Sequence, residues 1–380
     1  MSMYGGAETV VKELALNLKA LNIENLIITL NISEETRKIC AGLDMALPEK
    51  SFPYKFRSTD FFSSIGIIEE ARHLRRLVKK YAPGFDVINV HNFPAEWVTG
   101  GLRKPVVWMC NEIPDFYNNT RPSLTLKFLR RAGIGLDKLI VNRCIDAICV
   151  ADEFNAERVK KRYNRDSFII PYGIDYQMFN FQRSHSEEIY AQYNLSQSEF
   201  IALQVGVVSP QKNQIASLKA LRKLLENKID AKLILVGRSD TPYKQILDKY
   251  ILENELSGRV IFTGHLSKNI AARFYGIADI CLFPVKEQGG WLAPFEALLC
   301  ARPIMVSSTM GAATLIKKYN FGIVSEDFSS AISDFLPHQQ VWKDRAKEAA
   351  EWIKESLTWR NFTAKMVEAF EKTISGGAKA

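Results

Sequence analysis

The chain contains FPVKEQGGWLAPFEALLCARPIMVSS at residues 283–308, which reads as a strand, a glycine turn, a helix and a second strand. The apolar run 280–284 precedes a charged turn at 286–290, and a helix is predicted to open at Trp291. Pro294 falls in the first turn of that helix, where its missing N–H costs nothing. Such a unit aims backbone N–H groups and a positive helix end at the space above the turn. We therefore expect an anionic ligand there.

Length and composition narrow the class of protein. A chain of 380 residues is long enough for two or three domains, each with its own core. Its 47% hydrophobic and 24% charged residues are ordinary for a soluble globular protein. The formal charge of +8 suits phosphate-bearing partners, such as nucleic acid, an anionic membrane surface or a nucleotide sugar. We expect no nucleic acid, because the chain has no lysine-rich run and no aromatic RNA-binding motif.

Cysteine usage and the absence of targeting signals favour a cytoplasmic protein. No Cys-x-x-Cys pair occurs, and the cysteines lie mostly in apolar segments, as buried thiols of a reducing compartment do. No apolar stretch approaches the length of a membrane span, and the start MSMYGGAE has no secretory hydrophobic region. We therefore expect a cytoplasmic location. The six cysteines are Cys40, Cys110, Cys144, Cys149, Cys281 and Cys300.

The start of the chain is unusual for a doubly wound α/β domain. Such domains open with an apolar strand that leads into the first glycine turn. Here the turn Tyr4-Gly5-Gly6-Ala7-Glu8 comes almost at once, and a helix at 7–21 and a strand at 26–30 are predicted to follow it. Either the first strand is missing from this sequence, or the sheet forms without it.

Strands and helices alternate along the rest of the chain, which predicts parallel sheets joined by right-handed crossovers. Two predicted helices in the first half are strongly basic, at 65–81 and 121–143. The pattern is irregular at 32–64 and turns polar at 181–198, where we place a linker. The other predicted strands lie at 86–91, 105–110, 147–150, 168–170, 200–208, 232–236, 260–263, 280–283 and 304–306, and the other predicted helices at 153–163, 213–225, 243–253, 267–276, 340–357 and 359–374.

The central stretch also resembles the donor-site signature of a known family. The run from Gln288 to Pro303 is similar to that of retaining nucleotide-sugar glycosyltransferases, the large group 1 family with the GT-B fold. Each motif alone is weak, but the order and spacing of all of them favour the resemblance over nearly the whole chain. The other matching segments are Gly5-Gly6-Ala7-Glu8, Ile170-Pro171-Tyr172-Gly173-Ile174-Asp175, 206–212, Leu235-Val236-Gly237, Phe262-Thr263-Gly264-His265, Ala278-Asp279 and Leu357-Thr358-Trp359.

The resemblance implies an α/β protein of two Rossmann-like, doubly wound domains that face each other across a cleft. The first domain would span residues 1–180 and the second 198–355. The last helix, within 356–380, would return to the first domain, as it does in the family. The second domain would hold the nucleotide-sugar donor, and domain closure would exclude water and bring an acceptor to the anomeric carbon.

In this family two glutamates eight positions apart flank the glycine turn. Glu296 matches the second of them, which holds the donor ribose, and a carboxylate can accept from both vicinal hydroxyls at once. The alternative is that Glu296 only favours the helix dipole. The first glutamate, which holds hydroxyls of the donor sugar, falls on Gln288, with Glu287 one residue out of register. Gln288 can hydrogen-bond but brings no negative charge to a developing oxocarbenium ion.

A lysine and several backbone positions complete the expected donor site. Lys212 follows a predicted strand, where it can neutralise charge on the leaving diphosphate, unless it is only a solvated lysine at a helix start. The family has an arginine one position after the preceding glycine, and here that position is Val207. The remaining positions expected to bind the donor are the turn at Gly5 and Gly6, the base-binding edge at Gly264 and His265, and the turn and helix start at Gly289, Gly290, Trp291 and Leu292.

His91 and Asn111 are the candidates on the acceptor side. Many family members have a histidine at the end of the strand that corresponds to 106–110, and Asn111 takes that position here. Asn111 can position a hydroxyl but cannot take a proton. His91 ends the preceding strand and is the nearest polar group of that kind, although a lone histidine there is more often structural. In this fold the leaving phosphate is thought to accept the acceptor's proton, so a histidine is not required.

The favoured function is retaining transfer of a sugar from a UDP- or GDP-linked donor to a saccharide or lipid-linked saccharide, in glycan or cell-surface polysaccharide biosynthesis. The alternative is a non-catalytic relative that binds a nucleotide sugar, a glycan or a partner enzyme, which the changes at Gln288, Val207 and Asn111 favour. The sequence lacks a P-loop and a full Gly-x-Gly-x-x-Gly, which counts against a kinase or a dinucleotide oxidoreductase.

We expect no metal or other cofactor. The sequence has no Asp-x-Asp pair beside a donor turn and no His/Cys cluster at metal spacing, and the family needs no metal. The two basic helices have the charge to rest on the inner face of an anionic membrane, or they form ordinary solvated faces. The donor base and sugar, the acceptor, the linkage and the oligomeric state stay open.

Overall fold

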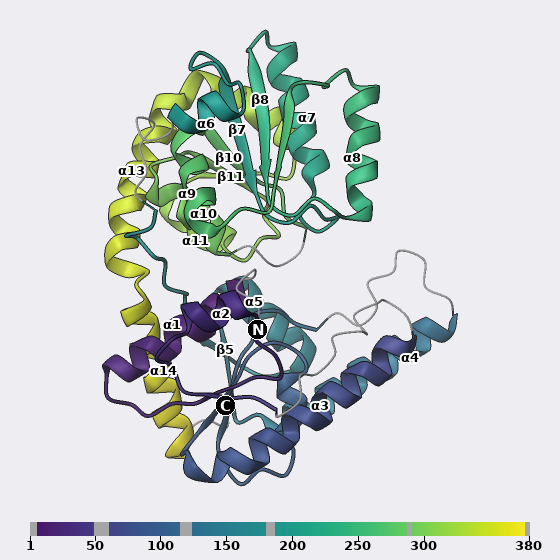
Figure 1. Ribbon diagram of the computed structural model, residues 1–380, viewed down its shortest axis with the longest axis vertical. Coiled ribbons are helices and arrows are strands. Elements are labelled where there is room, and N and C mark those ends of the chain that lie inside the picture. Colours follow the sequence, from purple (N-terminus) through teal and green to yellow (C-terminus); the bar gives the residue numbers. More distant parts are fainter. Residues whose placement is uncertain (1–5, 49–60, 115–123, 180–186, 287–290, 377–380) are drawn as a thin grey trace. The chain divides into compact units, whose positions relative to one another are not determined.

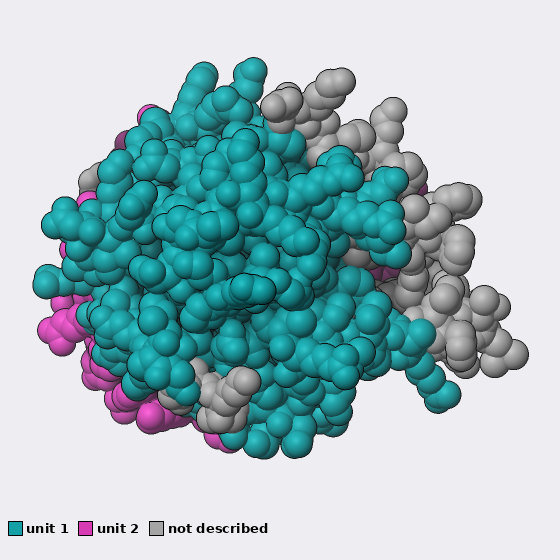
Figure 2. Space-filling view, turned by 90° about the horizontal axis from the view of Figure 1, so that it is seen from below, with its two compact units in different colours: residues 1–173, 359–380 teal, residues 174–358 magenta. Residues whose placement is uncertain are grey.

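The computed structural model describes residues 6–48, 61–114, 124–179, 187–286 and 291–376 (Figure 1). The chain forms two compact units, the first made of residues 1–173 with 359–380 and the second of residues 174–358; Figure 2 colours them teal and magenta. Each unit is built on a parallel sheet with helices packed on it. The expected α/β class is confirmed.

The first unit has a four-stranded parallel sheet in the order β3 (Ile88–Val90), β4 (Val106–Met109), β5 (Ala147–Val150) and β6 (Phe168–Ile169). Every residue of β4 and β5 is buried, as expected for parallel strands covered on both faces. A separate parallel pair consists of β1 (Ile27–Ile28) and β2 (Met45–Ala46).

Helices from both ends of the chain meet in the first unit. Figure 1 shows α14 (Trp359–Ile374) beside α1 (Gly6–Ala20), and α14 also contacts β4 and β5. The other helices of this unit are α2 (Glu34–Ile39), α3 (Phe61–Tyr81), η1 (Ala82–Gly84), η2 (Ala95–Val98), α4 (Leu124–Cys144) and α5 (Glu153–Tyr163). Both α3 and α4 pack against η2, while α5 packs on β5 and β6. Within the described residues, α1 is the first element of the chain.

The second unit has a six-stranded parallel sheet. Its strands, in spatial order, are β12 (Ile323–Val324), β11 (Ile304–Val306), β10 (Ile280–Phe283), β7 (Phe200–Val205), β8 (Ala231–Val236) and β9 (Val260–Gly264). The chain winds from β7 toward β9 and then returns to the other side of β7 with β10. The sheet is therefore doubly wound, with its topological switch point between β7 and β10.

Helices cover both faces of this sheet. Figure 1 shows α7 (Gln214–Glu226) and α8 (Pro242–Glu253) on one side of the sheet and α9 (Lys268–Ile277) and α10 (Leu292–Leu299) on the other. Alternate residues of β7 point to opposite faces, so Phe200 and Ala202 join the core beneath α7. The remaining helices of the unit are α6 (Glu187–Gln192), α11 (Ala313–Tyr319), α12 (Phe328–Phe335), η4 (Leu336–His338) and α13 (Gln339–Ser356).

The structure contains elements that the sequence analysis did not predict, among them α11, β12 and α12, and it also differs from the expectations in two short segments. The stretch 32–64, read as irregular, contains α2 and β2, and the stretch 181–198, read as a linker, contains α6. Each of these elements has six residues or fewer, which is too short for hydrophobic periodicity to be recognised. In α6 the side chains of Ile189 and Tyr190 are buried within the second unit. This burial is a tertiary effect that the local sequence does not show.

Candidate functional site

The candidate site of the second unit lies at the carboxyl ends of β7 and β10, on the two sides of the switch point. In open α/β sheets, ligands bind in the crevice outside the carboxyl ends of the strands at such a point. The turn that contains Lys212 follows β7, and the turn that begins at Lys286 follows β10. The backbone N–H of Lys286 donates to the carbonyl of Gln211 at 2.8 Å. The two turns are therefore held together at the edge where a ligand is expected.

A buried glutamine fixes the backbone at Lys212. Gln204 lies near the end of β7 and is 2% exposed. Its Nε2 donates to the carbonyl of Lys212 at 2.7 Å, and its Oε1 accepts from the hydroxyl of Ser217 on α7 at 2.7 Å. The side chain of Lys212 passes over Gly206, with its carbon atoms 3.6–3.7 Å from the point where a Cβ on Gly206 would stand. Lys212 is thus held at the strand end, beside bare glycine backbone.

Three neighbouring strands end in glycines at this edge. Gly206, Gly237 and Gly264 follow or close β7, β8 and β9, with φ angles of 149°, 142° and 72°. Side chains rarely adopt these φ values, so glycine is required there. The N–H of Gly237 donates to the carbonyl of Gly264 at 3.1 Å. Carbon atoms of Lys212 cover Gly206, and the carbonyl of Gly206 covers Gly237, so the missing side chains let these strand ends pack closely.

Glu296 lies in the second turn of α10, and α9 supplies its partners. The hydroxyl of Tyr275 donates to Oε2 at 3.1 Å, and Nζ of Lys268 lies 3.8 Å from Oε1. The carboxyl side chain is 12% exposed. Burial raises the pKa of Glu296, whereas Lys268 and the hydrogen bond from Tyr275 lower it and the charge of Asp175 raises it. The group is therefore a nearly buried carboxyl with one oxygen close to a cation.

The start of α10 follows the sequence expectation. Trp291 is the N-cap residue, and its ring packs on that of Phe295 with 4.6 Å between centroids. Pro294 is buried in the first turn and Leu292 is the first helical residue. Residues 287–290 of the glycine turn fall outside the described residues, together with one other expected position. These residues are Gly5, Glu287, Gln288, Gly289 and Gly290.

The first unit brings the two acceptor-side candidates to the carboxyl ends of β3 and β4. Nε2 of His91 lies 2.7 Å from Oδ1 of Asn89, and burial lowers the pKa of His91 to about 4. Asn111 accepts from the hydroxyl of Tyr172 at 2.6 Å and donates to Oδ1 of Asn92 at 3.1 Å. His91 is therefore neutral at neutral pH. Nδ1 of His91 is buried and has no hydrogen-bond partner among the described residues. Amide and imidazole groups are of the types that hydrogen-bond hydroxyls.

Two family models match the chain, one for each unit. Residues 185–356 match the model described as "Glycosyl transferases group 1", and residues 4–177 match the one described as "Glycosyltransferase Family 4". The chain belongs to the group 1 glycosyltransferases. The enzyme class expected from the sequence, glycosyltransferase, is the class of both models.

Individual relatives of this glycosyltransferase are distant. A GDP-mannose-dependent alpha-(1-6)-phosphatidylinositol dimannoside mannosyltransferase of Mycobacterium tuberculosis is 24% identical over 225 residues, which cover 58% of this chain and 56% of that protein. The chain thus spans about half the length of the curated relatives that it matches.

Solved structures confirm the GT-B fold. Sucrose-phosphate synthase from Thermosynechococcus elongatus superposes with a TM-score of 0.77 at 18% identity, over 98% of this chain and 94% of that chain. The Anabaena protein HepE, solved with UDP and glucose, also has a TM-score of 0.77, at 17% identity over 97% of this chain and 96% of its own.

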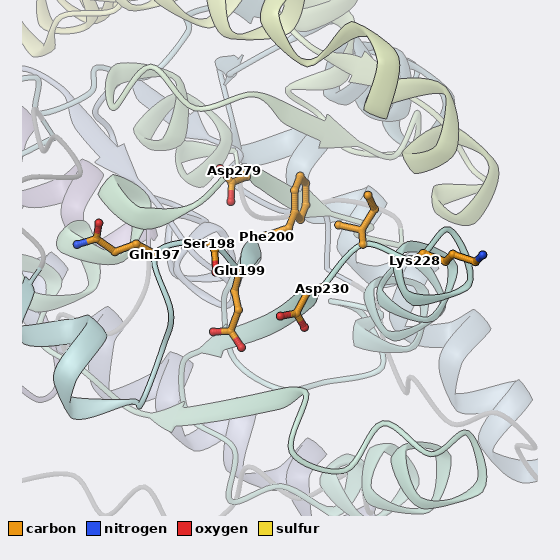
Figure 3. Close-up of a pocket in the computed structure, with 8 residues that line it drawn as sticks. Gln197, Ser198, Glu199, Phe200, Lys228, Asp230 and Asp279 are labelled. Atoms are coloured by element: carbon orange, nitrogen blue, oxygen red, sulfur yellow. The ribbon is translucent and has the colours of Figure 1, made fainter.

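The hollow drawn in Figure 3 lies at the opposite, amino end of the sheet of this glycosyltransferase. Its volume is about 340 Å³, and Glu199, Asp230 and Asp279 line it. Asp279 accepts from the N–H of Ile201 at 2.8 Å, and Glu199 forms an ion pair with Lys232 at 3.1 Å. These carboxylates stabilise strand starts, and their negative charge disfavours a diphosphate. The hollow is therefore a poor candidate for a diphosphate, and the carboxyl edge of the sheet is the candidate site.

Three residues that shape the site were not predicted from the sequence. Gln204, Tyr275 and Lys268 act on Lys212 and Glu296 through contacts made across the fold. A buried glutamine in an apolar strand was a possible signal for the first, since such groups need partners. Gly264 adopts the expected strand-end conformation, whereas His265 is exposed.

No group of three or more His, Cys, Asp or Glu side chains in the described part of the chain is placed to hold a metal ion. None of the described helices combines the length and the apolar character needed to cross a bilayer. The six cysteines are free thiols; Cys144 is half-buried and the other five are buried.

Proposed function

We propose that the chain is a retaining glycosyltransferase that moves a sugar from a nucleotide-sugar donor to a saccharide or lipid-linked acceptor. One observation carries the proposal. A lysine, Lys212, and a nearly buried carboxyl, Glu296, both lie in segments that follow the strands at the β7–β10 switch point, where neighbouring strands end in glycine. A cation beside bare backbone suits a diphosphate, and a buried carboxylate suits a ribose diol. UDP-, GDP- and ADP-linked sugars all contain these two parts.

The expected chemistry is charge stabilisation at the leaving group. As the bond between the anomeric carbon and the diphosphate breaks, negative charge collects on the phosphate, and Lys212 would stabilise it together with backbone N–H groups at the strand ends. Gln204 assists by holding the Lys212 backbone in place. Glu296 would anchor the ribose in both the ground state and the transition state, so its contribution lies in donor binding.

We assign the acceptor side to the first unit. His91 and Asn111 end neighbouring strands and present hydrogen-bonding groups that can position an acceptor hydroxyl. His91 can do this as a neutral ring, since its pKa is about 4. The acceptor's proton would then go to the leaving phosphate, as the family resemblance implies.

Two relatives support the choice of donor and acceptor. HepE was solved with UDP, and the mycobacterial relative is named for GDP-mannose and a phosphatidylinositol dimannoside. We therefore propose a UDP- or GDP-linked hexose as donor. For the acceptor we propose a saccharide, either free or linked to a lipid.

A thermal-shift screen with UDP, GDP and ADP and their hexose conjugates, with and without magnesium, tests the proposal. Binding of one donor should raise the melting temperature. Glu296→Gln should lower the affinity for that donor by roughly tenfold to one hundredfold, because a charge-assisted hydrogen bond contributes about 1.5–3 kcal/mol. Glu157→Gln, an exposed carboxylate on α5, is the matched control. No shift with any nucleotide would contradict the donor site.

Two residues favour the alternative, a non-catalytic binding protein: Val207 and Asn111 occupy positions where the family has arginine and histidine. Donor hydrolysis and transfer to simple glycosides separate the two functions once a donor is known. A binder would respond to the donor in the thermal-shift screen but release no nucleoside diphosphate. If Gln288→Glu then created turnover, the native protein would be a binding protein.

We also propose peripheral association with an anionic membrane through α3 and α4. Leu136 and Leu139 are 47% exposed, one turn apart on α4, and Arg131 and Lys138 are exposed beside them. On α3, Ile68 is 46% exposed and several basic residues follow it. Exposed apolar side chains flanked by cations suit the interface of an anionic bilayer.

Sedimentation with vesicles tests this association. Phosphatidylglycerol vesicles should bind the protein, and phosphatidylcholine vesicles should not. The double variant Arg131→Glu, Lys138→Glu should lower binding at least tenfold, since each basic residue near the surface contributes about 1 kcal/mol. The same reversal on α13, Lys343→Glu with Lys347→Glu, should have little effect. If both double variants lost vesicle binding equally, the effect would come from net charge alone and not from α4.

A further inference from the structure

The carboxyl group of Glu296 lies against one face of α9. Lys268 and Tyr275 are seven residues apart on this helix, a spacing that brings two side chains to the same face. Tyr275 donates to one carboxyl oxygen at 3.1 Å, and the ammonium group of Lys268 lies 3.8 Å from the other. One helix thus supplies both a neutral donor and a cation to the same carboxyl.

Lys268 is itself held in place by an aromatic ring. Its Nζ lies 5.3 Å from the centroid of the Phe179 ring, within cation–π range. Phe179 is 1% exposed, and its ring packs edge-on against that of Tyr275 at 5.9 Å. The ammonium group is therefore fixed beside the carboxyl even though the side chain is 43% exposed. The mechanism proposed above gives Lys268 no role.

We propose that Lys268 is a positioning residue for donor binding: its ammonium group holds Glu296 as a charged acceptor for the ribose hydroxyls of the nucleotide sugar. This inference rests on the proposed donor site. The 3.8 Å separation leaves the facing carboxyl oxygen close to a cation without a short hydrogen bond to it. Ribose hydroxyls can therefore bond that oxygen without displacing the lysine.

The electrostatics around Glu296 explain why a cation is needed. Burial raises the pKa of Glu296, and the charge of Asp175 raises it further. Lys268 acts most strongly in the opposite direction, followed by the hydrogen bond from Tyr275. From β10, the thiol of Cys281 faces Tyr275, and burial keeps that thiol protonated by raising its pKa well above the usual value. A protonated Glu296 would lose acceptor capacity and with it the paired bonds to a diol.

The pH dependence of donor affinity tests the role of Lys268. UDP-glucose, GDP-mannose and ADP-glucose are suitable probes, because the charge on their phosphates is constant between roughly pH 5 and 8.5. A change of affinity in this range therefore reports the titration of protein groups. The dissociation constant of the tightest of the three is measured across this range for the wild type, Lys268→Met and Lys268→Arg. In Lys268→Met the loss of affinity on acidification should begin roughly one pH unit higher, because an opposite charge at this distance lowers a carboxyl pKa by about 1–3 units and partial exposure favours the low end.

Controls separate this role from a general effect on the fold. Lys268→Arg should keep the wild-type profile, and Lys223→Met, a lysine of similar exposure paired with Glu226 on α7, should do so as well. Tyr275→Phe should shift the profile in the same direction as Lys268→Met, since it removes the other group that favours the charged carboxyl. All variants are compared in melting temperature without ligand to exclude unfolding.

The possible results have distinct meanings. An unchanged profile in Lys268→Met, or an equal loss of affinity at every pH, would overturn the role of Lys268 while leaving the donor site intact. Failure of the wild type to bind any of the three nucleotide sugars would instead overturn the donor site, and this inference with it.

Discussion

Glu96 shows at the scale of a single residue how burial changes chemistry. Its side chain is fully buried in η2, and neither carboxyl oxygen has a hydrogen-bond partner among the described residues. Burial, with the nearby charge of Asp137, raises the pKa of Glu96 to about 8. Asp137 on α4 is equally buried but accepts from Trp97 at 2.9 Å and from Tyr163 at 2.7 Å. Two carboxyls in one core thus have opposite environments, one satisfied and one not.

The pKa of Glu96 predicts a loss of stability as pH rises. The folded protein holds the proton more tightly than the unfolded chain, whose value is 4.5, so the free energy of unfolding should fall between about pH 4.5 and 8. The contribution is on the order of 3–5 kcal/mol, since each pKa unit corresponds to about 1.4 kcal/mol. Glu96→Gln should abolish it. Urea unfolding at pH 6 and pH 9 measures the difference.

An exposed glutamate provides the control for Glu96. Glu157→Gln on α5 should reproduce the wild-type pH dependence. If the free energy of unfolding changes equally between pH 6 and pH 9 in the wild type and in Glu96→Gln, Glu96 does not titrate in this range.

At the scale of elements, the carboxyl ends of β7, β8 and β9 determine where a ligand can approach. The strands were predictable, because each contains an apolar run of three or four residues, at 200–203, 233–236 and 260–262, bounded by glycine or polar residues. Their spatial order was not, since residues 206–279 separate β7 from β10 and no sequence signal indicates that the two strands pair. The switch point, and with it the place of the donor site, is a property of this order.

Gly237→Ala tests the close packing of these strand ends. A Cβ at this position would lie 2.3 Å from the carbonyl oxygen of Gly206, and φ is 142°. Both the clash and the backbone conformation oppose a side chain, so we expect a loss of roughly 3 kcal/mol or more in the free energy of unfolding. Chemical denaturation measures it.

Gly264→Ala is the matched comparison for Gly237→Ala. Its φ is 72°, and a Cβ there would meet no atom within 4 Å. Only backbone strain opposes the alanine, so the free energy of unfolding should fall by about 1–2 kcal/mol. Equal losses in the two variants would mean that the backbone at Gly206 yields to the added methyl group.

At the scale of the whole molecule, the chain is divided between two units, and its last helix completes the first. α14 buries Phe362 and Met366 in the first unit, and the Phe362 ring meets Tyr172 at 5.9 Å and Trp359 at 5.7 Å. Residues more than 180 positions apart in the sequence therefore form one core. Stability of the first unit depends on the end of the chain being present.

Phe362→Ala should destabilise the first unit by about 3–5 kcal/mol, as expected for a large buried aromatic side chain. Hydrogen exchange followed by mass spectrometry should show faster exchange in residues 61–173 and little change in 187–358. Phe335→Ala is the converse control, because this ring is fully buried in the second unit and packs on Phe200 at 6.4 Å. Faster exchange throughout the chain in both variants would mean that the two units unfold together.

The sequence by itself determined the α/β class, most elements, the family and the positions of Lys212 and Glu296. The class and the elements depend on local signals: apolar runs of strand length, glycines at strand ends, and a helix start with proline in its first turn. The family and the two site residues came from the resemblance of the motifs to the group 1 family. The bounds of β5, α5, β10, β11 and α14 match the predicted ranges, because the three strands are short apolar runs and the two helices have apolar residues at helical spacing.

Only the tertiary structure decided the environment of each functional group. The cation beside Glu296 comes from α9, the support of Lys212 from within β7, and the neutral state of His91 from burial. None of these follows from residue type or spacing, because the contacts join segments whose distance in space depends on strand order and helix packing. Charge state and hydrogen bonding are set by such neighbours, and they decide what a carboxylate or an imidazole can do.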